Sequence, residues 1–435
     1  MKKQETKTIK TPAGRLLALL AGFVLLAGCL CGAAAEEEKD LDVAELLDLS
    51  ELDESEIEEV EILPPDATLK ARDREWHTPA EGSPVKCNHE VCYWTTPMGY
   101  TDEAAVWKVL TAPVTVLEDG TKNCQRKQFK IRKYPDSGCA EYTGEVTGSS
   151  QGVHVLERGE EWTLIEAYSS STEGSSVRVW AKKFQGYVET SLLKEVEVDQ
   201  TYGVVIDKQF QRLYLYKEGK LYSTMLCSTG YYNPKKKNPW NETPAGEFLC
   251  VSWTGDFSLK DDDGNANMIC EDAIRINDGI LIHMVPKIPK TDDVGNVKWT
   301  YDRCERYLGE KASHGCVRVQ RQKTPEGVNE KWLWENLSNG TKKGQAFTKV
   351  IIWDDAGRDL DYPDDSLKLY YNPKHYASYY HSSPDCLLIK GSSKTIEITY
   401  GQLEDREYAK KKPCPACVPE PTREGIETLN AKNNR

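Results

Sequence analysis

Apolar and polar residues alternate in short runs through much of the chain, and Gly, Ser, Asp and Pro separate the runs. A period of two indicates β-strands, because successive side chains of a strand point to opposite faces. Between residues 84 and 198 we predict strands from six runs: Val106 to Leu117, Phe129 to Arg132, Gly144 to Val155, Trp162 to Tyr168, Val177 to Trp180 and Gly186 to Leu193. Short strands at this spacing favour a small β-barrel in the first folded region.

A second β-rich region follows over residues 200–354. Two apolar runs, Tyr202 to Asp207 and Gln211 to Tyr216, lead into a turn at Glu218-Gly219-Lys220. This pattern predicts two strands followed by a hairpin. The chain is long enough for two or three domains with hydrophobic cores.

The N-terminus has a different pattern, in which basic residues precede an apolar run from Leu16 to Leu30. This is the order of an export signal, and the run is short for a transmembrane helix. Within it, Leu26-Ala27-Gly28-Cys29 resembles the lipobox of bacterial lipoproteins, and cleavage after Ala35 is the alternative. We predict a signal peptide over residues 1–35 and an extracytoplasmic chain. A lipid on Cys29 would hold it at the outer face of the membrane, and ordinary cleavage would release it to the cell wall.

Acidic residues make up about half of the segment from Glu36 to Ile62. Its 14 acidic residues and one Lys carry a charge of −13, which equals the formal net charge of the whole chain. Such a segment, without aromatic residues, cannot bury enough apolar surface to fold alone. We predict an acidic disordered linker over residues 36–83, with a weak amphipathic helix as the alternative. The remaining residues are nearly balanced in charge and give no indication of nucleic-acid binding.

The chain has 14 cysteines, which is many for an exported protein, and exported cysteines usually form disulfides. Spacing alone does not fix their connectivity. Cys87 and Cys92 are close enough in sequence to pair locally, and Cys124 with Cys139 and Cys270 with Cys304 are further candidate pairs. Cys227 and Cys250 lie in alternating apolar runs, and we expect them to be buried free thiols.

One short motif combines a thiol with imidazoles: Ser313-His314-Gly315-Cys316, followed by Val317-Arg318 and preceded at a distance by His283. Cysteine attacks as a thiolate, and a thiol with a pKa of about 8.5 needs a base, which either histidine could supply. The glycine permits a tight turn, and nearby backbone amides could stabilise an oxyanion. An isolated Cys is more often a small buried apolar residue, but this combination favours a catalytic cysteine.

Further landmarks precede this motif in a fixed order: the strand from Tyr202, Ser228-Thr229-Gly230, Thr243-Pro244-Ala245-Gly246-Glu247-Phe248, and His283. Together with Ser313 to Arg318 they make residues 202–353 resemble the catalytic domain of L,D-transpeptidases, enzymes that cross-link bacterial peptidoglycan. The resemblance implies a mainly β fold, with a sandwich-like catalytic core and the cysteine on a loop at one edge. The catalytic domain is expected over residues 200–354.

The resemblance also implies roles for individual residues. Cys316 would be the nucleophile, and His283 the proton donor and acceptor, with its imidazole fixed by the carbonyl of Met284. Four more residues are implied: Ser313, His314 and Gly315 as the shell of the turn and oxyanion site, and Arg318 as a residue that positions either a substrate carboxylate or the loop.

The implied reaction is acyl transfer and needs no cofactor. The thiolate attacks the carbonyl of the third residue of a tetrapeptide stem, D-alanine leaves, and the amine of a diamino acid on a second stem resolves the thioester. The expected partners are therefore donor and acceptor stems of peptidoglycan. Transfer to water would make the site an L,D-carboxypeptidase, and a non-catalytic wall-binding lipoprotein is the other alternative. Cysteine peptidases that cut wall peptides are a rival class, because they also carry SH3-like modules. In those enzymes the Cys precedes its His along the chain, whereas here His283 precedes Cys316, so the order argues against that class.

The interval between His283 and Cys316 is longer than the usual family spacing, because Lys287 to Arg306 are inserted. Long loops beside sites commonly act as lids or binding elements. We therefore expect this insertion to cover the substrate, with an inert excursion as the alternative.

The segment from Gly144 to Leu193 resembles a bacterial SH3-like domain, over about residues 144–198 of the first region. The resemblance rests on Gly144-Glu145-Val146, Gly159-Glu160-Glu161-Trp162 and Gly186-Tyr187-Val188. It implies a module that binds the wall or acts as a spacer, and a rigid β extension without a ligand is the alternative.

The C-terminal region carries a separate signal. His381, Cys386, Cys414 and Cys417 supply an imidazole and three thiols, the last two within a Pro-Cys-Pro-Ala-Cys sequence. That is the number and kind of ligands in a tetrahedral structural zinc site. The pattern resembles small His/Cys modules at the ends of other exported bacterial proteins. We predict such a module over residues 362–420 and a tail over 421–435, with a disulfide plus a free thiol as the alternative to zinc.

Overall fold

The computed structural model describes residues 100–432, apart from 172–174, 178, 232–240, 261–265 and 341–344. Residues 84–258 and 268–435 form one compact unit, and residues 1–83 are grouped with 259–267 in another. The predicted signal peptide with Cys29, the acidic linker and the Cys87–Cys92 pair lie outside the described residues. Within the described part of the chain, no helix is long and apolar enough to cross a membrane.

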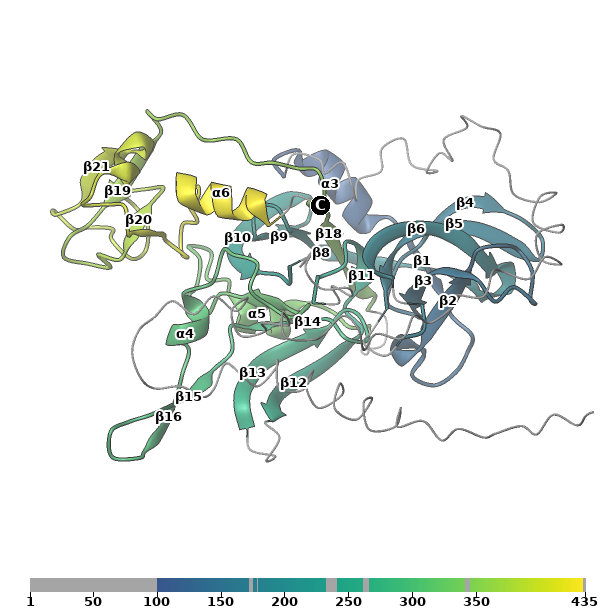
Figure 1. Ribbon diagram of the computed structural model, residues 1–435. Helices are drawn as coiled ribbons and strands as arrows, with labels where there is room; N and C mark the ends of the chain where they lie inside the picture. The colour runs from purple at the N-terminus through teal and green to yellow at the C-terminus, as the bar shows by residue number, and fades with distance from the viewer. Residues whose placement is uncertain are drawn as a thin grey trace, which may run out of the picture. The chain divides into compact units, whose positions relative to one another are not determined.

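The protein is mainly β, as the alternating pattern predicts (Figure 1). In the first region, five strands form a sheet in the order β3-β2-β6-β5-β4. Their bounds are β2 (Gln128–Arg132), β3 (Tyr142–Thr147), β4 (His154–Arg158), β5 (Trp162–Ser170) and β6 (Trp180–Glu189). A separate antiparallel pair consists of β1 (Val114–Leu117) and β7 (Leu193–Val196). Ile131, Val146 and Ile165 form the fully buried core of this region.

The prediction of a strand from Val106 to Leu117 is wrong in its first half. Residues Glu103–Thr111 form helix α3, and only Val114–Leu117 form a strand. Asp102 caps the helix, because its side chain accepts a hydrogen bond from the Ala105 amide at 3.3 Å. Val106 and Leu110, one helical turn apart, are fully buried, so the helical spacing of apolar residues determines the structure here.

Nine strands build the second sheet, in the order β11-β18-β8-β9-β10-β17-β14-β13-β12. Their bounds are β8 (Val198–Asp207), β9 (Arg212–Lys217), β10 (Lys220–Ser228), β11 (Gly246–Leu249), β12 (Ser252–Lys260), β13 (Ala266–Arg275), β14 (Leu281–Met284), β17 (Val317–Val319) and β18 (Phe347–Trp353). Two neighbouring pairs run parallel, β14 with β17 and β18 with β8. Helix α5 (Glu330–Asn336) contributes Leu333 to the same apolar core as Leu213, Ile282 and Val317.

A buried lysine connects this sheet to α3. Lys349 on β18 is only 1% exposed. Its ammonium donates to the carbonyls of Val109 and Ala112 at 2.6 and 3.1 Å and pairs with Glu247 at 2.8 Å. A buried charge is tolerated only when it is paired and hydrogen-bonded, so α3 and the second sheet depend on each other.

The inserted segment folds into a hairpin that extends away from the sheet (Figure 1). It consists of β15 (Ile288–Thr291) and β16 (Val297–Thr300), followed by α4 (Asp302–Glu305). Val294 at the hairpin tip is 81% exposed. At its base, Lys287 pairs with Glu271 at 2.6 Å.

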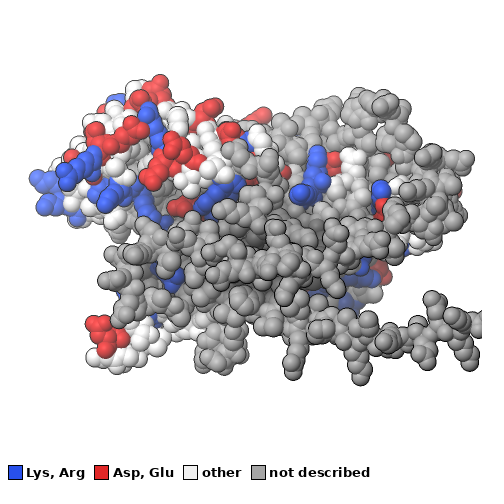
Figure 2. All heavy atoms as spheres, viewed as in Figure 1, with Lys and Arg blue, Asp and Glu red and all other residues white. Residues whose placement is uncertain are grey.

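The C-terminal region has its own four-stranded sheet, in the order β21-β19-β20-β22. The bounds are β19 (Lys368–Tyr371), β20 (Tyr379–His381), β21 (Ile396–Thr399) and β22 (Lys412–Pro413). The last helix, α6 (Arg423–Ala431), buries Ile426 and Leu429 in a cluster with Leu360. Acidic and basic side chains are interspersed on the surface of this region, at the upper left of Figure 2.

No disulfide joins the ten cysteines among the described residues. The candidate pairs Cys124–Cys139 and Cys270–Cys304 are therefore not bonded in this structure. Cys124 and Cys139 have separate backbone acceptors, the carbonyls of Leu117 at 3.8 Å and Glu141 at 3.3 Å, while Cys270 and Cys304 lie in one apolar cluster. Two other thiols are fully buried and free, as the alternating runs predict: Cys227 and Cys250.

Candidate active site and candidate metal centre

Two neighbouring strands bring the predicted base close to the predicted nucleophile. β14 pairs with β17 in parallel, and His283 lies opposite Arg318 in this ladder. Cys316 directly precedes β17, two residues before Arg318, and residues two apart along a strand share a face. The ladder therefore presents Cys316, Arg318 and His283 on one side. Ile282 and Val317, on the opposite face, are fully buried in the core.

His283 is buried and held in one orientation. Its Nδ1 lies 2.7 Å from the carbonyl oxygen of Met284, the contact that the family resemblance implies. Since a carbonyl only accepts, Nδ1 carries the proton and Nε2 keeps a free lone pair. Phe257 packs edge-on against the imidazole, with ring centroids 6.0 Å apart. Burial, and then the charge of Arg318, lower the pKa of His283 to about 4, so the ring is neutral at neutral pH.

Cys316 is half-buried, and its Sγ makes a polar contact with the Gly279 carbonyl at 3.9 Å. Desolvation raises the pKa of the thiol, while the Leu281 amide and the Arg318 guanidinium oppose that rise. Among the described residues, no hydrogen bond joins the Cys316 thiol to His283. The two groups therefore rest as a neutral thiol and a neutral imidazole, and catalytic hydrogen bonds often tighten only when substrate binds.

Local hydrogen bonds close the turn before Cys316. The Ser313 hydroxyl donates to the Cys316 carbonyl and accepts from the Gly315 amide, the second bond being 3.2 Å long. Gly315 has φ +118°, a conformation that favours glycine. Because its amide is already bonded to Ser313, the Gly315 N–H does not point at an oxyanion in this state.

Thr243 and Gly230 also hold the turn, a role that the sequence pattern alone does not indicate. Thr243 Oγ1 donates to the Gly315 carbonyl at 2.6 Å and accepts from the Gly230 amide at 2.8 Å. A Cβ on Gly230 would lie 1.8 Å from the Asn241 carbonyl oxygen, so only glycine fits there. Both residues belong to the short motifs that carry the family resemblance, and this was the available signal.

Arg318 and His314 occupy different environments. Arg318 is 8% exposed, and its Nη1 donates to the Ala312 carbonyl at 2.9 Å, just before the turn. His314 is exposed, although the glycine that follows it is buried. Arg318 thus contacts the loop directly, and His314 lies where a ligand can reach it.

A buried ion network lies next to the same loop. The Lys208 ammonium is 2.8 Å from Glu242, 3.1 Å from Asp354 and 3.0 Å from Asp355. Lys311, two residues before the turn, also pairs with Asp355, and burial lowers the pKa of Lys311 to about 6. The three carboxylates lie close enough to hold a metal ion, but Lys208 already supplies the cation that they share.

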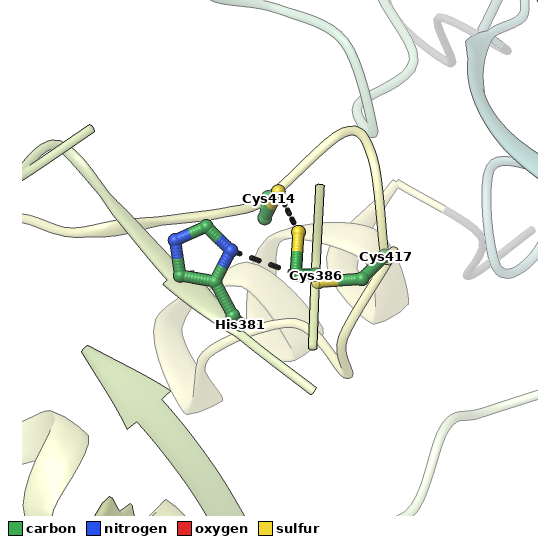
Figure 3. Close-up of side chains that lie close together, drawn as sticks. All are labelled: His381, Cys386, Cys414 and Cys417. Carbon is green, nitrogen blue, oxygen red and sulfur yellow. Dashed lines mark hydrogen bonds between the residues drawn. The ribbon is translucent and has the colours of Figure 1, made fainter. Parts of the chain in front are cut away.

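The four C-terminal residues predicted to bind zinc converge (Figure 3). The ligand atoms of His381, Cys386, Cys414 and Cys417 all lie within 4.8 Å of one another. The Sγ atoms of Cys386 and Cys414 are 3.7 Å apart, and Cys417 Sγ is 3.7 Å from His381 Nδ1. His381 ends β20, and the last two cysteines follow β22 on a short knuckle. The arrangement is a compact set of soft donors, three of them buried.

The sequence of the second region matches a known family. Residues 201–352 match the model of the YkuD family, the L,D-transpeptidase catalytic domain. This match confirms the family resemblance of residues 202–353. No curated protein matches the chain.

Similar solved structures cover parts of the chain. An L,D-transpeptidase from Xylanimonas cellulosilytica is 18% identical, with 36% of this chain and 61% of that chain covered and a TM-score of 0.23. An L,D-transpeptidase from Mycobacterium smegmatis is 14% identical, with 56% and 91% covered and a TM-score of 0.25. A fused Zn-dependent amidase/peptidase/peptidoglycan-binding domain-containing protein from Clostridium acetobutylicum is 18% identical, with 35% and 52% covered and a TM-score of 0.22. The chain thus spans about half to three fifths of the length of the first and third of these.

Proposed function

We propose that this chain, whose residues 201–352 form an L,D-transpeptidase catalytic domain, transfers peptidoglycan stem peptides through a thioester on Cys316. The observation that carries the proposal is the β14–β17 ladder, in which His283 lies opposite Arg318, two residues after Cys316. The family match supports the class of reaction, and the contacts within this chain support the role of each residue. The products are cross-links between stems or the attachment of a partner to the wall.

The reaction starts from a neutral pair. When substrate excludes water, the thiol of Cys316 turns toward Nε2 of His283, and its proton moves to Nε2 as the sulfur attacks the carbonyl carbon of the third stem residue. The bond from Nδ1 to Met284 keeps the ring oriented throughout. The imidazolium formed beside Arg318 is a stronger acid than an ordinary histidine, because the pKa of His283 is lowered to about 4. It therefore gives its proton readily to the leaving amine.

The tetrahedral intermediate places negative charge on the former carbonyl oxygen, and we assign the Cys316 amide as a donor to it. When the intermediate collapses, the C–N bond to D-alanine breaks, its nitrogen takes the proton from His283, and the thioester remains. An acceptor amine then attacks the thioester carbonyl and passes a proton to His283. The C–S bond then breaks, and Cys316 leaves as a thiolate that takes the proton back from His283. The new amide bond is then complete.

Water is the competing acceptor at the same thioester. Hydrolysis would make the protein an L,D-carboxypeptidase, with the same residues in the same roles. A protein that only binds the wall would leave the thiol of Cys316 unmodified. These alternatives differ in the fate of the acyl group, and one experiment separates them.

The test is acylation of the purified chain by a tetrapeptide stem, followed by intact-mass spectrometry. We expect the chain to gain the mass of the tripeptide acyl group, and Cys316→Ala to gain none. Cys139→Ala removes a buried thiol far along the chain from the motif and should be acylated normally. Adding an acceptor amine should convert the adduct to a cross-linked product, whereas a carboxypeptidase would release free tripeptide. An adduct in Cys316→Ala, or none in the folded parent chain, would contradict the proposal.

We also propose a structural zinc ion in the C-terminal region. Zn–S bonds of about 2.3 Å place two thiolates on one tetrahedral ion about 3.8 Å apart. The 3.7 Å separation of Cys386 and Cys414 fits this edge, and a disulfide would require about 2.05 Å. His381 and Cys417 complete the donor set at a similar separation. The ion would hold the knuckle to the end of β20 and would take no part in acyl transfer.

The remaining proposals concern location and recognition. Peptidoglycan lies outside the cytoplasm, in agreement with the export signal predicted over residues 1–35 and with a lipid on Cys29. The SH3-like segment, about residues 144–198, would contact the wall. The hairpin formed by residues 287–306 would act as a substrate-covering or binding element beside the site.

A further inference from the structure

A cavity of about 150 Å³ lies beside the Cys316 turn, between the first region and the second sheet. The residues of its wall that matter here are Ser169, Ser171 and Trp180 from the first region, and Asn277, Gly279 and His314 from the second. The cavity lies next to the proposed nucleophile, because Gly279 in its lining contacts Cys316 Sγ through its carbonyl at 3.9 Å and His314 belongs to the turn.

Buried hydrogen bonds hold the two walls of this cavity together. The Thr147 hydroxyl donates to Asn277 Oδ1 at 2.7 Å, and Asn277 is 1% exposed. The Tyr168 hydroxyl donates to Asp354 at 2.9 Å, where both side chains are buried. Breaking such bonds would leave buried polar groups unpaired, which is costly. The cavity is therefore a fixed feature of the unit formed by residues 84–258 and 268–435.

The indole of Trp180 brings a buried hydrogen-bond donor to the lining. Trp180 is 6% exposed, and its indole N–H has no hydrogen-bond acceptor among the described residues. Buried polar groups are nearly always hydrogen-bonded, so an orphaned donor in a cavity indicates a missing acceptor. Ala181, the next residue, has φ +49°, a strained conformation for a residue other than glycine. Strained backbone of this kind is concentrated at functional sites.

The size and chemistry of the cavity limit what can fill it. Since a water molecule occupies about 30 Å³ in the liquid, the cavity holds roughly five non-hydrogen atoms. An alanine residue within a peptide has that number. The Ser171 hydroxyl, which lies 3.1 Å from that of Ser169, makes the wall polar. A small residue with a carbonyl or carboxylate oxygen for the Trp180 N–H therefore fits.

We propose that this cavity is a subsite for the stem peptide, in which one alanine-sized residue places its carbonyl or carboxylate oxygen on Trp180 Nε1. The inference rests on the proposed transpeptidase function and extends it, since the first region then takes part in substrate recognition at the active site. Donor and acceptor stems offer the same chemistry, so the experiment measures the two half-reactions separately.

The test compares the full chain with Trp180→Phe, which keeps an aromatic ring and removes the N–H. Acylation of Cys316 by a tetrapeptide stem reports on the donor, and the ratio of aminolysis to hydrolysis of the thioester reports on the acceptor. We expect one of the two to fall about tenfold, the effect of one lost hydrogen bond to a ligand. Ser171→Leu, which fills the cavity, should lower the same quantity. Trp162→Phe, on β5 of the same sheet and outside the cavity, should match the parent chain.

The outcomes separate this inference from the function on which it rests. If the parent chain forms the Cys316 adduct, but both Trp180→Phe and Ser171→Leu acylate and transfer normally, the subsite is wrong and the transpeptidase function stands. If the folded parent forms no adduct, the function itself fails. A third measurement, calorimetric binding of the stem to Cys316→Ala with and without Trp180→Phe, requires no turnover. Equal affinities in this pair would also overturn the subsite for a donor stem.

Discussion

His283 and Arg318 lie opposite each other in the parallel ladder of β14 and β17, so a permanent cation stands beside a buried base. The charge of Arg318 disfavours the protonated imidazole of His283 and favours the thiolate of Cys316. At rest, the thiol of Cys316 and the imidazole of His283 are therefore both neutral and form no ion pair.

Replacement of Arg318 should move the acid limb of the activity profile. In Arg318→Gln the neighbouring cation is gone, so the pKa of His283 rises from about 4 and the base is lost at a higher pH. The rate of Cys316 acylation, measured from pH 4 to 8, should therefore fall off at a higher pH than in the parent. Arg321→Gln, which removes a surface pair with Glu305 at 3.2 Å, is the control. An unshifted limb in Arg318→Gln would contradict the electrostatic role.

Burial of neutral His283 should make the stability of the protein depend on pH. Because its pKa is about 4 in the folded chain and about 6.5 when unfolded, the unfolded chain binds more protons between these values. Stability should rise with pH through that window, by about 3 kcal/mol from this group, and be lost as the pH falls. His283→Asn keeps a donor for Met284 and cannot titrate, so its unfolding curves at pH 4.5 and 7 should differ less than those of the parent.

The hydroxyl of Thr243 should be required for acylation. It is both a donor to Gly315 and an acceptor from Gly230. Thr243→Val keeps the shape and leaves two buried backbone groups unpaired, at a cost of about 1–3 kcal/mol. We expect acylation of Cys316 to fall at least tenfold in Thr243→Val and to recover in Thr243→Ser. Equal rates in the two variants would show that the hydroxyl has no role.

The C-terminal site should bind one zinc ion per chain. Metal analysis of the purified protein should find it, and substitution with Co²⁺ should give the sulfur-to-metal absorption of a tetrahedral thiolate site. Cys414→Ser should lose most of the metal, while Cys139→Ser, a buried cysteine outside the cluster, should keep it. A metal-free chain that is lighter by two protons would indicate a disulfide instead.

The sequence predicts much of the candidate site because the residues proposed to carry its chemistry are close together along the chain or on neighbouring strands. Cys316, Arg318 and Ser313 lie within six residues, and His283 reaches them through one parallel pairing. The four proposed zinc ligands follow the same rule, with one pair around β20 and another after β22. The spacing of these residues can be read from the sequence, whereas the contacts between them are known only from the structure.

Other features depend on tertiary contacts that a linear pattern does not contain. The roles of Thr243 and Gly230 arise because their loops meet the Gly315 turn. The helix over residues 103–111 is missed because an apolar run containing Val106 and Leu110 also satisfies the pattern of a strand, and Asp102 as a cap decides between them. Disulfide pairs also cannot be predicted from sequence spacing, since proximity along the chain does not bring Cys124 to Cys139.

Lys349 sets a practical limit on how the protein can be divided. Its ammonium, 1% exposed, takes two of its acceptors from Val109 and Ala112, which lie outside residues 200–354. An excised fragment with those bounds would retain Glu247 as a partner and leave the rest of that charge without its acceptors. Such a fragment would have to admit water to its core or lose its edge strands. The smallest self-sufficient enzyme therefore begins before α3.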